Sequence, residues 1–383
     1  MRKGWEIKKL GVVCEIINGS TPLKSNKEFW DNGDFPWFTI DDIREQGRII
    51  RYTKQKVTNA ALKKLRVLPC ETILLCCTAS IGEFAITNIE LTSNQQFNGL
   101  VVKNKKEVLP MFLYYFSSTL KGILFNLSGK TTIDFISIAK IKEIQIPIPP
   151  LPEQQRIVSI LDEAFSSIEQ AKENLQCNLQ NAKELFQSEL NNIFTNKGEG
   201  WEEKTLGEVC DELFAGGDAP KENFSSEKTE INNIPIYANA VKDKGLYGFT
   251  NYARVTKPSI SIAARGSGTG HTFLRQGNYF PIVRLIVVIP NTELIDLCFL
   301  KLAIDTLVII RSGSAIPQLT IPMIKNYTIP FPSLETQQKI VQQLDKLSTE
   351  TKRLEAMYQQ KLDSLEELKK SILQKAFSGE LSN

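Results

Sequence analysis

This 383-residue chain has two segments in which basic side chains alternate with polar and aromatic ones. These side chains are the best candidates for a binding function. Residues 40–66 hold eight Lys or Arg against three Asp or Glu, and residues 231–290 hold seven against one. Such side chains can neutralise phosphates, and Arg, Lys, Asn and Gln can read base edges in the major groove. The candidate residues are Arg44, Arg48, Arg51, Tyr52, Lys54 and Lys56 in the first patch and Lys242, Lys244, Tyr247, Arg254, Arg265 and Arg275 in the second.

The alternative for each of these residues is an ordinary solvated surface. The net charge of +3 does not decide the question, because it averages over segments of different character. Residues 151–196 reverse the sign, with three basic and seven acidic residues. Two separate basic patches therefore favour a polyanion such as nucleic acid facing two regions of the chain.

Catalytic and cofactor motifs are weak. The segment "SGKTT" at residues 128–132 has the tail of a phosphate-binding loop, but Leu124 stands where the first glycine is required, which favours a loop or turn. The segment "RGSGTGH" at residues 265–271 lacks the third glycine of a dinucleotide fingerprint and precedes no helical pattern. Asp41 and Asp42 are the nearest candidate for paired carboxylates, and a turn or cap explains them more simply.

Cysteine and histidine usage argues against metal and His-based chemistry. There are seven cysteines without a CxxC spacing, and Cys76 and Cys77 lie in an apolar segment, so we expect buried free thiols. His271 is the single histidine. Composition is typical of a soluble globular protein, and the apolar runs are too short to span a bilayer. No signal peptide is evident, so we expect a cytoplasmic protein.

An internal duplication frames the chain. The segment "PIPPLPEQQRIVSILD" at residues 147–162 recurs without a gap as "PFPSLETQQKIVQQLD" at residues 330–345. The segment "WEIKKLGVVCEIINGSTP" from residue 5 resembles "WEEKTLGEVCDELFAGGDAP" from residue 201. Between these segments the two halves differ, which predicts a frame that was kept while its interior changed.

A long helix is predicted after each proline-rich segment, because apolar residues then recur every three or four positions. Each helix would have about 42 residues and a length of roughly 63 Å. A helix with a single apolar seam needs a second helix, and each helix follows its own globular domain, so we expect antiparallel pairing. The seam positions are Ile157, Leu161, Phe165, Ile168, Ala171, Leu175, Leu179, Ala182, Phe186, Leu190 and Ile193, and then Ile340, Leu344, Leu347, Thr351, Leu354, Tyr358, Lys361, Leu365, Leu368 and Ile372.

The globular interiors give mixed signals. Residues 72–86 and 259–268 are predicted to be β-rich and to end in turns, and residues 109–127 and 294–313 are predicted to be helical. The predicted fold class is therefore α+β, with two globular domains separated by two long antiparallel helices and related by an internal repeat. The predicted domains are residues 1–150, spacer helix 151–197, residues 198–333 and spacer helix 334–383.

The proline-rich exit, paired glutamines and "IV" step at both helix starts resemble the specificity subunit of type I restriction-modification systems. The segments "INGSTP" (17–22), "PWFTIDDI" (36–43), "IPIYANA" (234–240) and "QKAFSGEL" (374–381) agree with this resemblance. One departure is "AGGDAP", which replaces "GSTP" in the second half and shifts its glycine turn. The positions carried over from the family are architectural: Pro149, Leu151, Gln154, Gln155, Ile157, Val158, Pro332, Leu334, Gln337, Gln338, Ile340 and Val341.

The resemblance implies a non-catalytic subunit with two target recognition domains, each binding one half of a bipartite double-stranded DNA target. It further implies that the helices dock two methyltransferase subunits and that restriction subunits join this core. S-adenosylmethionine, ATP and Mg²⁺ would be used by these partners, with no cofactor in this chain. Since the interiors differ, we expect an asymmetric target. The alternatives are a coiled-coil scaffold with protein-binding globular ends and an enzyme with divergent motifs.

Overall fold

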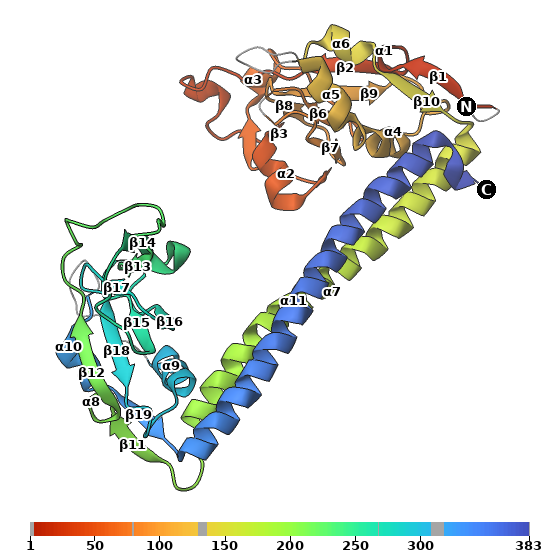
Figure 1. Cartoon of the computed structure of the whole chain (residues 1–383). Helices are drawn as coiled ribbons and strands as arrows, with labels where there is room; N and C mark the ends of the chain where they lie inside the picture. Colours follow the sequence, from red (N-terminus) through yellow and green to blue (C-terminus); the bar gives the residue numbers. More distant parts are fainter. Residues whose placement is uncertain (1–3, 79, 129–135, 267, 308–317, 383) are drawn as a thin grey trace. The chain divides into compact units, whose positions relative to one another are not determined.

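The computed structural model describes residues 4–78, 80–128, 136–266, 268–307 and 318–382. The chain divides into two compact units, unit 1 with Met1–Leu175 and Gln360–Asn383, and unit 2 with Gln176–Gln359. The two long helices are α7 (Leu151–Thr195) and α11 (Leu334–Ser378), each of 45 residues (Figure 1). Each unit therefore consists of a globular part and a stretch of both long helices.

A five-stranded sheet forms the centre of unit 1. Its strands, in spatial order, are β2 (Cys14–Asn18), β9 (Phe97–Val102), β6 (Ile73–Cys76), β7 (Phe84–Thr87) and β4 (Ile49–Ile50). The hairpin of β6 and β7 confirms the β-rich prediction for residues 72–86, and every residue of both strands is buried. Strands covered on both faces lack a polar face, which is why this segment is apolar without alternation.

Two smaller sheets complete the strands of unit 1. One consists of β5 (Gln55–Val57), β3 (Phe35–Phe38) and β8 (Thr92–Ser93), and the other of β1 (Glu6–Lys9) and β10 (Gln145–Ile148). The short helices are η1 (Lys27–Phe29), α1 (Leu10–Val13), α2 (Ile40–Gln46), α3 (Asn59–Leu62), α4 (Pro110–Ser117), α5 (Leu120–Ser128), α6 (Ile138–Lys142) and η3 (Glu380–Ser382).

The helical prediction for residues 109–127 is confirmed by α4 and α5, which are separated at Ser118 and Thr119. The Ser118 hydroxyl donates to the Tyr115 carbonyl at 2.5 Å and the Thr119 hydroxyl to the Phe116 carbonyl at 2.7 Å. These hydroxyls compete for the carbonyls that a continuing helix would use. The apolar periodicity alone could not reveal that break.

Unit 2 repeats this plan. Its four-stranded sheet has the order β12 (Cys210–Ala215), β18 (Ile286–Pro290), β15 (Ser259–Ile262) and β16 (Thr272–Arg275). Two further sheets are β14 (Leu246–Thr250), β13 (Ile234–Tyr237) and β17 (Phe280–Pro281), and β11 (Glu202–Thr205) with β19 (Thr328–Phe331). The helices are α8 (Leu206–Val209), η2 (Lys242–Gly245), α9 (Leu297–Thr306) and α10 (Ile321–Lys325).

Two sequence predictions are tested by these elements. Strand β15 confirms β structure in residues 259–268, of which Ser267 lies outside the described residues. Helix α9 begins after Asp296, whose carboxylate accepts hydrogen bonds from the backbone N–H groups of Cys298 at 2.8 Å and Phe299 at 2.9 Å. Residues 308–313 of the predicted helix lie outside the described residues.

The two globular interiors share one topology although their sequences differ. The order β2-β9-β6-β7 corresponds to β12-β18-β15-β16, and β5-β3-β8 corresponds to β14-β13-β17. The central strand of each three-stranded sheet pairs antiparallel with one neighbour and parallel with the other. The expectation that the interior changed therefore holds for its side chains and not for its strand order.

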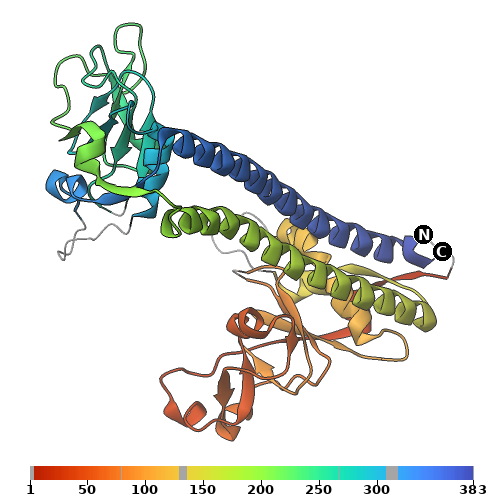
Figure 2. The same cartoon turned by 90° about the horizontal axis from the view of Figure 1, so that it is seen from below.

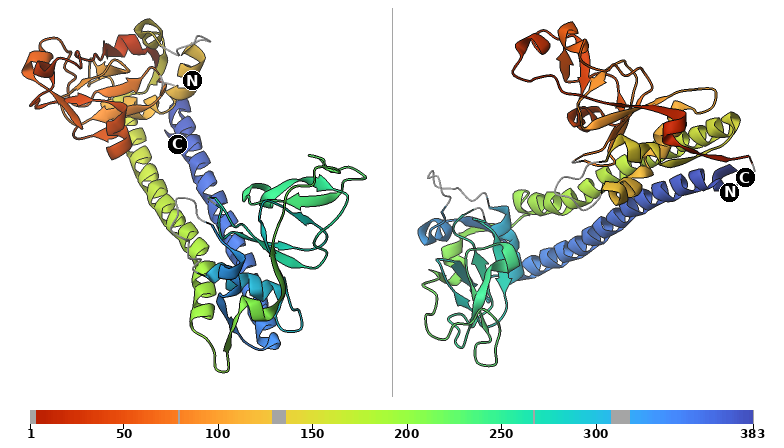
Figure 3. Two further views of the ribbon diagram at one scale, coloured as in Figure 1. Left: turned by 90° about the vertical axis from the view of Figure 1, so that its left-hand side faces the viewer. Right: turned by 90° about the horizontal axis from the view of Figure 1, so that it is seen from above.

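The long helices run without a break (Figures 2 and 3) and pair antiparallel within each unit. In unit 1 the Lys369 ammonium lies 4.9 Å from the centre of the Phe165 ring, and Lys172 pairs with Glu366 at 2.8 Å. In unit 2 the Gln343 amide donates to the Glu189 carboxylate at 3.2 Å. In unit 1 the contact partners on α11 have lower residue numbers as the residue number on α7 rises, which confirms the predicted antiparallel direction.

The predicted seam of α7 is confirmed at every position, since each is buried or half-buried. In α11 the prediction is wrong at Lys361 and at Leu368, which is 47% exposed. Leu362 and Lys369 are half-buried and Leu373 is buried instead. A straight helix has 3.6 residues per turn, so its inward face drifts away from a strict 3.5-residue repeat.

The cysteines are all free thiols, and Cys14, Cys76 and Cys77 are buried as expected. Burial raises the pKa of Cys14 and of Cys77 to about 12. Cys70 and Cys177 are exposed, so the expectation of burial is wrong for them. Among the helices within the described ranges, none is long and apolar enough to cross a membrane.

Candidate nucleic-acid interface and helix starts

The start of α7 is fixed by one wholly buried side chain, that of Gln154. Its Oε1 accepts a hydrogen bond from the Leu109 backbone N–H at 2.9 Å. Its Nε2 donates to the carbonyls of Glu107 and Pro149, both at 2.8 Å. The helix, the proline-rich segment before it and the approach to α4 are therefore tied together at one residue.

The start of α11 has the same arrangement at Gln337, which is also wholly buried. Its Oε1 accepts from the Asp296 backbone N–H at 2.8 Å. Its Nε2 donates to the carbonyls of Leu294 at 3.2 Å and Pro332 at 2.9 Å. The sequence repeat thus reflects a repeated set of hydrogen bonds. In each unit the glutamine binds backbone groups just before a helix of the globular part, α4 in unit 1 and α9 in unit 2.

The remaining residues of the helix starts divide into buried and exposed positions. Gln155 and Gln338, the second glutamine of each pair, are exposed. Ile157 is 1% exposed and Ile340 8% exposed, and each belongs to the apolar core of its unit. The prolines are buried, and the leucines and valines are half-buried: Pro149, Pro332, Leu151, Leu334, Val158 and Val341.

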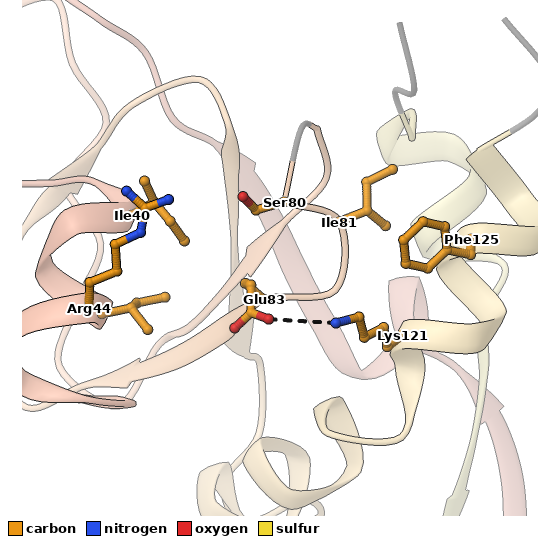
Figure 4. A pocket seen from close by; sticks show the side chains of 8 residues that line it. Ile40, Arg44, Ser80, Ile81, Glu83, Lys121 and Phe125 are labelled. Atoms are coloured by element: carbon orange, nitrogen blue, oxygen red, sulfur yellow. Dashed lines mark ion pairs between the residues drawn. The ribbon is translucent and has the colours of Figure 1, made fainter. Parts of the chain in front are cut away.

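A pocket of about 410 Å³ lies beside the first basic patch (Figure 4). Glu83 lies in this pocket and pairs with Lys121 at 3.8 Å and with Arg48 at 3.5 Å. Arg44 also lines it and pairs with Asp41 at 2.9 Å. Lys121 was missed in the sequence, because the apolar pattern of its helix indicated only a core position. The pocket is lined by Ile40, Ile43, Arg44, Ser80, Ile81, Glu83, Lys121 and Phe125.

The other predicted residues of the first patch are exposed and differ in their partners. Lys54 pairs with Glu45 at 2.6 Å, and the Tyr52 hydroxyl donates to the same carboxylate at 2.9 Å. Arg51 and Lys56 are exposed and make no ion pair with any residue that the structure describes. The positive charge of this patch is thus partly neutralised, and among the predicted residues Arg51 and Lys56 keep a free charge.

Arg275 does not lie at the surface, where a DNA-contacting residue would have to be. It is 5% exposed, and its Nε donates to the Ser261 hydroxyl at 2.8 Å. A second guanidinium nitrogen donates to the Lys244 carbonyl at 2.5 Å, and the group lies 3.5 Å from the centre of the Tyr237 ring. Arg275 therefore holds the interior together, a role that its position at the end of a strand did not reveal.

Lys242, Lys244 and Tyr247 lie on or beside η2 and are exposed. Lys244 adopts the left-handed conformation, with φ 53°. Tyr247 is 53% exposed, and its ring centre lies 5.5 Å from that of Phe224. This segment therefore presents two cations and an aromatic ring to solvent.

Arg254 and Arg265 are exposed, as a DNA contact requires. The Arg254 guanidinium lies 4.8 Å from the centre of the Phe214 ring, and Arg265 donates to the Gln318 side chain at 3.2 Å. Arg284, which was not predicted, lines a cavity of about 210 Å³ together with Arg265. None of these three arginines makes an ion pair within the part of the chain that the structure describes. Arg284 was overlooked because apolar residues flank it.

The weak catalytic motifs acquire structural explanations. Asp42 belongs to a capping box at the start of α2, where it accepts from the Thr39 backbone N–H at 2.7 Å, so its interpretation as a cap is confirmed. The glycine-rich residues 265–271 lead into strand β16. Residues 129–132 of "SGKTT" lie outside the described residues. No group of three or more metal-ligating side chains gathers among the described residues.

Known proteins share the sequence along nearly the whole chain. The specificity subunit of the type I restriction enzyme EcoprrI from Escherichia coli is 29% identical, covering 89% of this chain and 87% of that protein. The specificity subunit of MjaIX from Methanocaldococcus jannaschii is 28% identical, covering 99% and 94%. Their names agree with the prediction of a specificity subunit.

Solved structures share the fold. A chain of a type I R-M system, from work on its complex assembly and conformational transition, has a TM-score of 0.82 at 20% identity, with 99% of each chain covered. The HsdS subunit from Thermoanaerobacter tengcongensis has a TM-score of 0.68 at 20% identity, covering 99% of this chain and 98% of that one.

The family model described as "Type I restriction modification DNA specificity domain" matches residues 2–176 and again residues 198–366. The two matches reproduce the duplication, and they confirm the resemblance inferred from the helix starts. The chain therefore belongs to the type I restriction-modification DNA specificity family and carries its domain twice.

Proposed function

We propose that this chain selects the DNA target of a type I restriction-modification complex, with one recognition domain for each half of a bipartite, asymmetric site. The recognition domains are residues 1–150 and 198–333, and residues 151–197 and 334–383 are the spacer helices. The observation that carries the proposal is one fold present twice with different exposed side chains. Because the two domains share a fold, each can present its side chains to DNA from equivalent positions. Because their exposed side chains differ, the two domains select different half-sites.

The exposed basic residues support contact with the DNA backbone. Arg51, Lys56, Arg254 and Arg265 are exposed and are not neutralised by carboxylates among the described residues. Each phosphate contact releases counterions, so affinity should fall steeply as salt rises. We keep the other exposed candidates as proposed contacts and exclude Arg275, since it is buried.

The partners proposed for this subunit are two methyltransferase subunits docked on the long helices, with restriction subunits joining the assembly. S-adenosylmethionine, ATP and Mg²⁺ would act in those partners. Exposed positions beside the buried seam, such as Gln155 and Gln338, leave the outer surfaces of both helices open to other chains. The cytoplasm is the proposed location, since DNA and the partner subunits are there.

The competing function is a coiled-coil scaffold whose globular ends bind proteins. Salt dependence separates the two functions, because a protein-binding surface without phosphate contacts lacks the steep negative slope. Binding of a DNA duplex to the complex, titrated between low and physiological salt, measures this slope.

Mapping of methylated genomic sites tests the proposal directly. The full chain is co-expressed with its methyltransferase partner, and the methylated bases are located by sequencing. We expect a single asymmetric motif made of two half-sites and an unspecified spacer. A stable complex that methylates no bipartite motif would rule the proposal out.

A helix insertion tests the spacer. One heptad added to both α7 and α11 keeps the seam in phase and lengthens each helix by about 10 Å. This length is close to three base pairs of B-DNA. We expect the spacer to change while both half-sites stay the same, and altered half-site bases with an unchanged spacer would contradict the model.

A further inference from the structure

Two turns occupy equivalent places in the two units. The first, between β8 and β9, has Gln95 and Gln96 at its centre, and the second, between β17 and β18, has Val283 and Arg284. Each follows a strand that pairs parallel with the middle strand of its three-stranded sheet. Each also precedes a strand that lies second in its larger sheet.

Hydrogen bonds fix this equivalence residue by residue. Asn94 N–H donates to the Phe38 carbonyl at 3.1 Å, and Ile282 N–H donates to the Tyr237 carbonyl at 2.9 Å. Within the turns, Phe97 N–H donates to the Asn94 carbonyl at 3.2 Å. The corresponding bond from Leu285 N–H to the Ile282 carbonyl is 3.0 Å. Gln95 therefore corresponds to Val283, and Gln96 corresponds to Arg284.

A glycine supports each turn from the neighbouring strand. Gly19 N–H donates to the Phe97 carbonyl at 3.0 Å, and Gly216 N–H donates to the Leu285 carbonyl at 2.8 Å. A Cβ added to Gly19 would lie 2.6 Å from the Ser93 carbonyl oxygen, and one added to Gly216 would lie 2.6 Å from the Pro281 carbonyl carbon. The segment "AGGDAP" thus supports its turn in the same way as "NGSTP", which resolves the departure seen in the sequence.

The β17–β18 turn is held in an unfavourable conformation. Val283 and Arg284 have φ of 52° and 60°, which is left-handed and rare for a β-branched residue such as valine. Asn239 fixes this conformation, because its amide donates to the Val283 carbonyl while its Oδ1 accepts from Ala264 N–H at 2.8 Å. Strain maintained by surrounding bonds is typical of functional segments.

The side chains of the turns face solvent and differ in chemistry. Val283 is 53% exposed, and Arg284 is exposed. Gln95 is exposed and accepts a hydrogen bond from the Thr21 hydroxyl, and Gln96 is half-buried. The turn thus presents an exposed glutamine in one unit and an exposed arginine in the other, at neighbouring positions of the shared register.

We infer that these turns read bases, with Arg284 contacting a guanine in one half-site and Gln95 an adenine in the other. The inference rests on the proposed function and assigns the residues that select the sequence. Arginine pairs in a bidentate manner with the O6 and N7 atoms of guanine, and glutamine pairs with N6 and N7 of adenine. A turn fixed at both ends directs such a side chain with little loss of conformational freedom.

The test uses the full chain in complex with its methyltransferase partner. Methylated genomic sites are mapped for the wild-type chain and for Arg284→Ala, Arg284→Lys and Gln95→Ala. Arg284→Ala and Arg284→Lys should relax one guanine position in one half-site, lowering discrimination there by roughly 5-fold to 100-fold. Gln95→Ala should relax one adenine position in the other half-site only. Arg284→Lys keeps the charge and loses the planar fork, so it carries the test if Arg284→Ala fails to fold.

The controls separate base contacts from other effects. Gln276→Ala removes an exposed glutamine of unit 2 outside the turn and should leave both half-sites unchanged. Arg254→Ala should lower methylation of all sites evenly, as loss of a phosphate contact does. A wild-type complex without a bipartite motif overturns both proposals. A normal wild-type motif that the Arg284 variants leave unchanged, or weaken evenly at all sites, overturns this inference alone.

Discussion

The globular parts of the two units share their strand order but differ in the side chains of one equivalent turn. Their larger sheets share the strand order, and their β8–β9 and β17–β18 turns follow the same hydrogen-bond register. At the centre of that turn, however, unit 1 has Gln95 and Gln96 while unit 2 has Val283 and Arg284. The strand order and the shared hydrogen bonds therefore determine where the turn lies, and its residues determine its chemistry.

The helix starts show the opposite relation, because here the side chains themselves are the same. Gln154 and Gln337 make matching sets of three hydrogen bonds. A wholly buried amide leaves little freedom, since each unpaired polar group in the interior is destabilising. The comparison predicts that substitutions of the two buried glutamines, here called the joints, destabilise their units equally. It predicts different effects for substitutions of exposed side chains in the two units.

The largest effect is expected at the joints. Gln154→Leu and Gln337→Leu each leave one N–H and two carbonyls without their partner, which should lower the stability of the affected unit by about 3 to 4 kcal/mol. Hydrogen exchange in denaturant follows the two units separately, with the amides of Leu109 and Asp296 as local probes.

The matched controls are Gln155→Leu and Gln338→Leu, which change the exposed neighbour on the same helix turn. They should alter stability by less than about 0.5 kcal/mol. If Gln337→Leu were neutral while Gln154→Leu destabilised unit 1, the two joints would not be equivalent.

A smaller effect is expected from substituting Arg275, which is buried, and almost none from substituting Arg254, which is exposed. Arg275→Met removes a buried guanidinium from the Ser261 hydroxyl and the Lys244 carbonyl, and should destabilise unit 2 by about 2 to 3 kcal/mol. Arg254→Ala should leave stability within about 0.5 kcal/mol, since Arg254 is exposed.

Thermal unfolding and salt titration of DNA binding distinguish these two roles. Arg254→Ala should reduce the slope of log affinity against log salt by about one. A stable Arg275→Met variant with a reduced salt slope would show that Arg275 contacts phosphate after all.

The smallest effect is expected at the glycines beneath the turns. Gly19→Ala and Gly216→Ala place a methyl group against backbone atoms, which should cost about 1 to 2 kcal/mol in each unit. Gly122→Ala is the control, because a Cβ there meets nothing within 4 Å and alanine is preferred in a helix interior. Denaturant unfolding measures all three variants, and a neutral Gly216→Ala would mean that the two turns are supported differently.

Local patterns made much of the architecture predictable. The long helices and the α7 seam follow from apolar residues three to seven apart, within reach of a periodicity argument. The helix starts follow from the repeated segment, and the antiparallel pairing follows from each helix coming after its own globular domain. The family resemblance followed from the same segments. The break at Ser118 and the shifted seam at Leu362 were missed, because side-chain competition and helix drift leave the apolar pattern almost unchanged.

The candidate site was less predictable, since it depends on contacts between distant residues. Charge alone selected Arg275, which is buried and hydrogen-bonded to Ser261 and Lys244. Arg284 was recognised as a candidate only from the hydrogen bonds that make it equivalent to Gln96 of the other repeat. Such correspondence requires strand pairing over long separations, which composition and spacing do not encode.

The bonds at the helix starts have one further consequence. Gln154 and Gln337 bind only backbone groups of the globular parts, an N–H and a carbonyl near the start of a helix. Backbone groups are the same whatever the side chains around them. The joint therefore accepts any interior that presents this pair at the same place. Under the proposed function, a whole recognition domain is replaceable, with a new target as the result and no redesign of the helices.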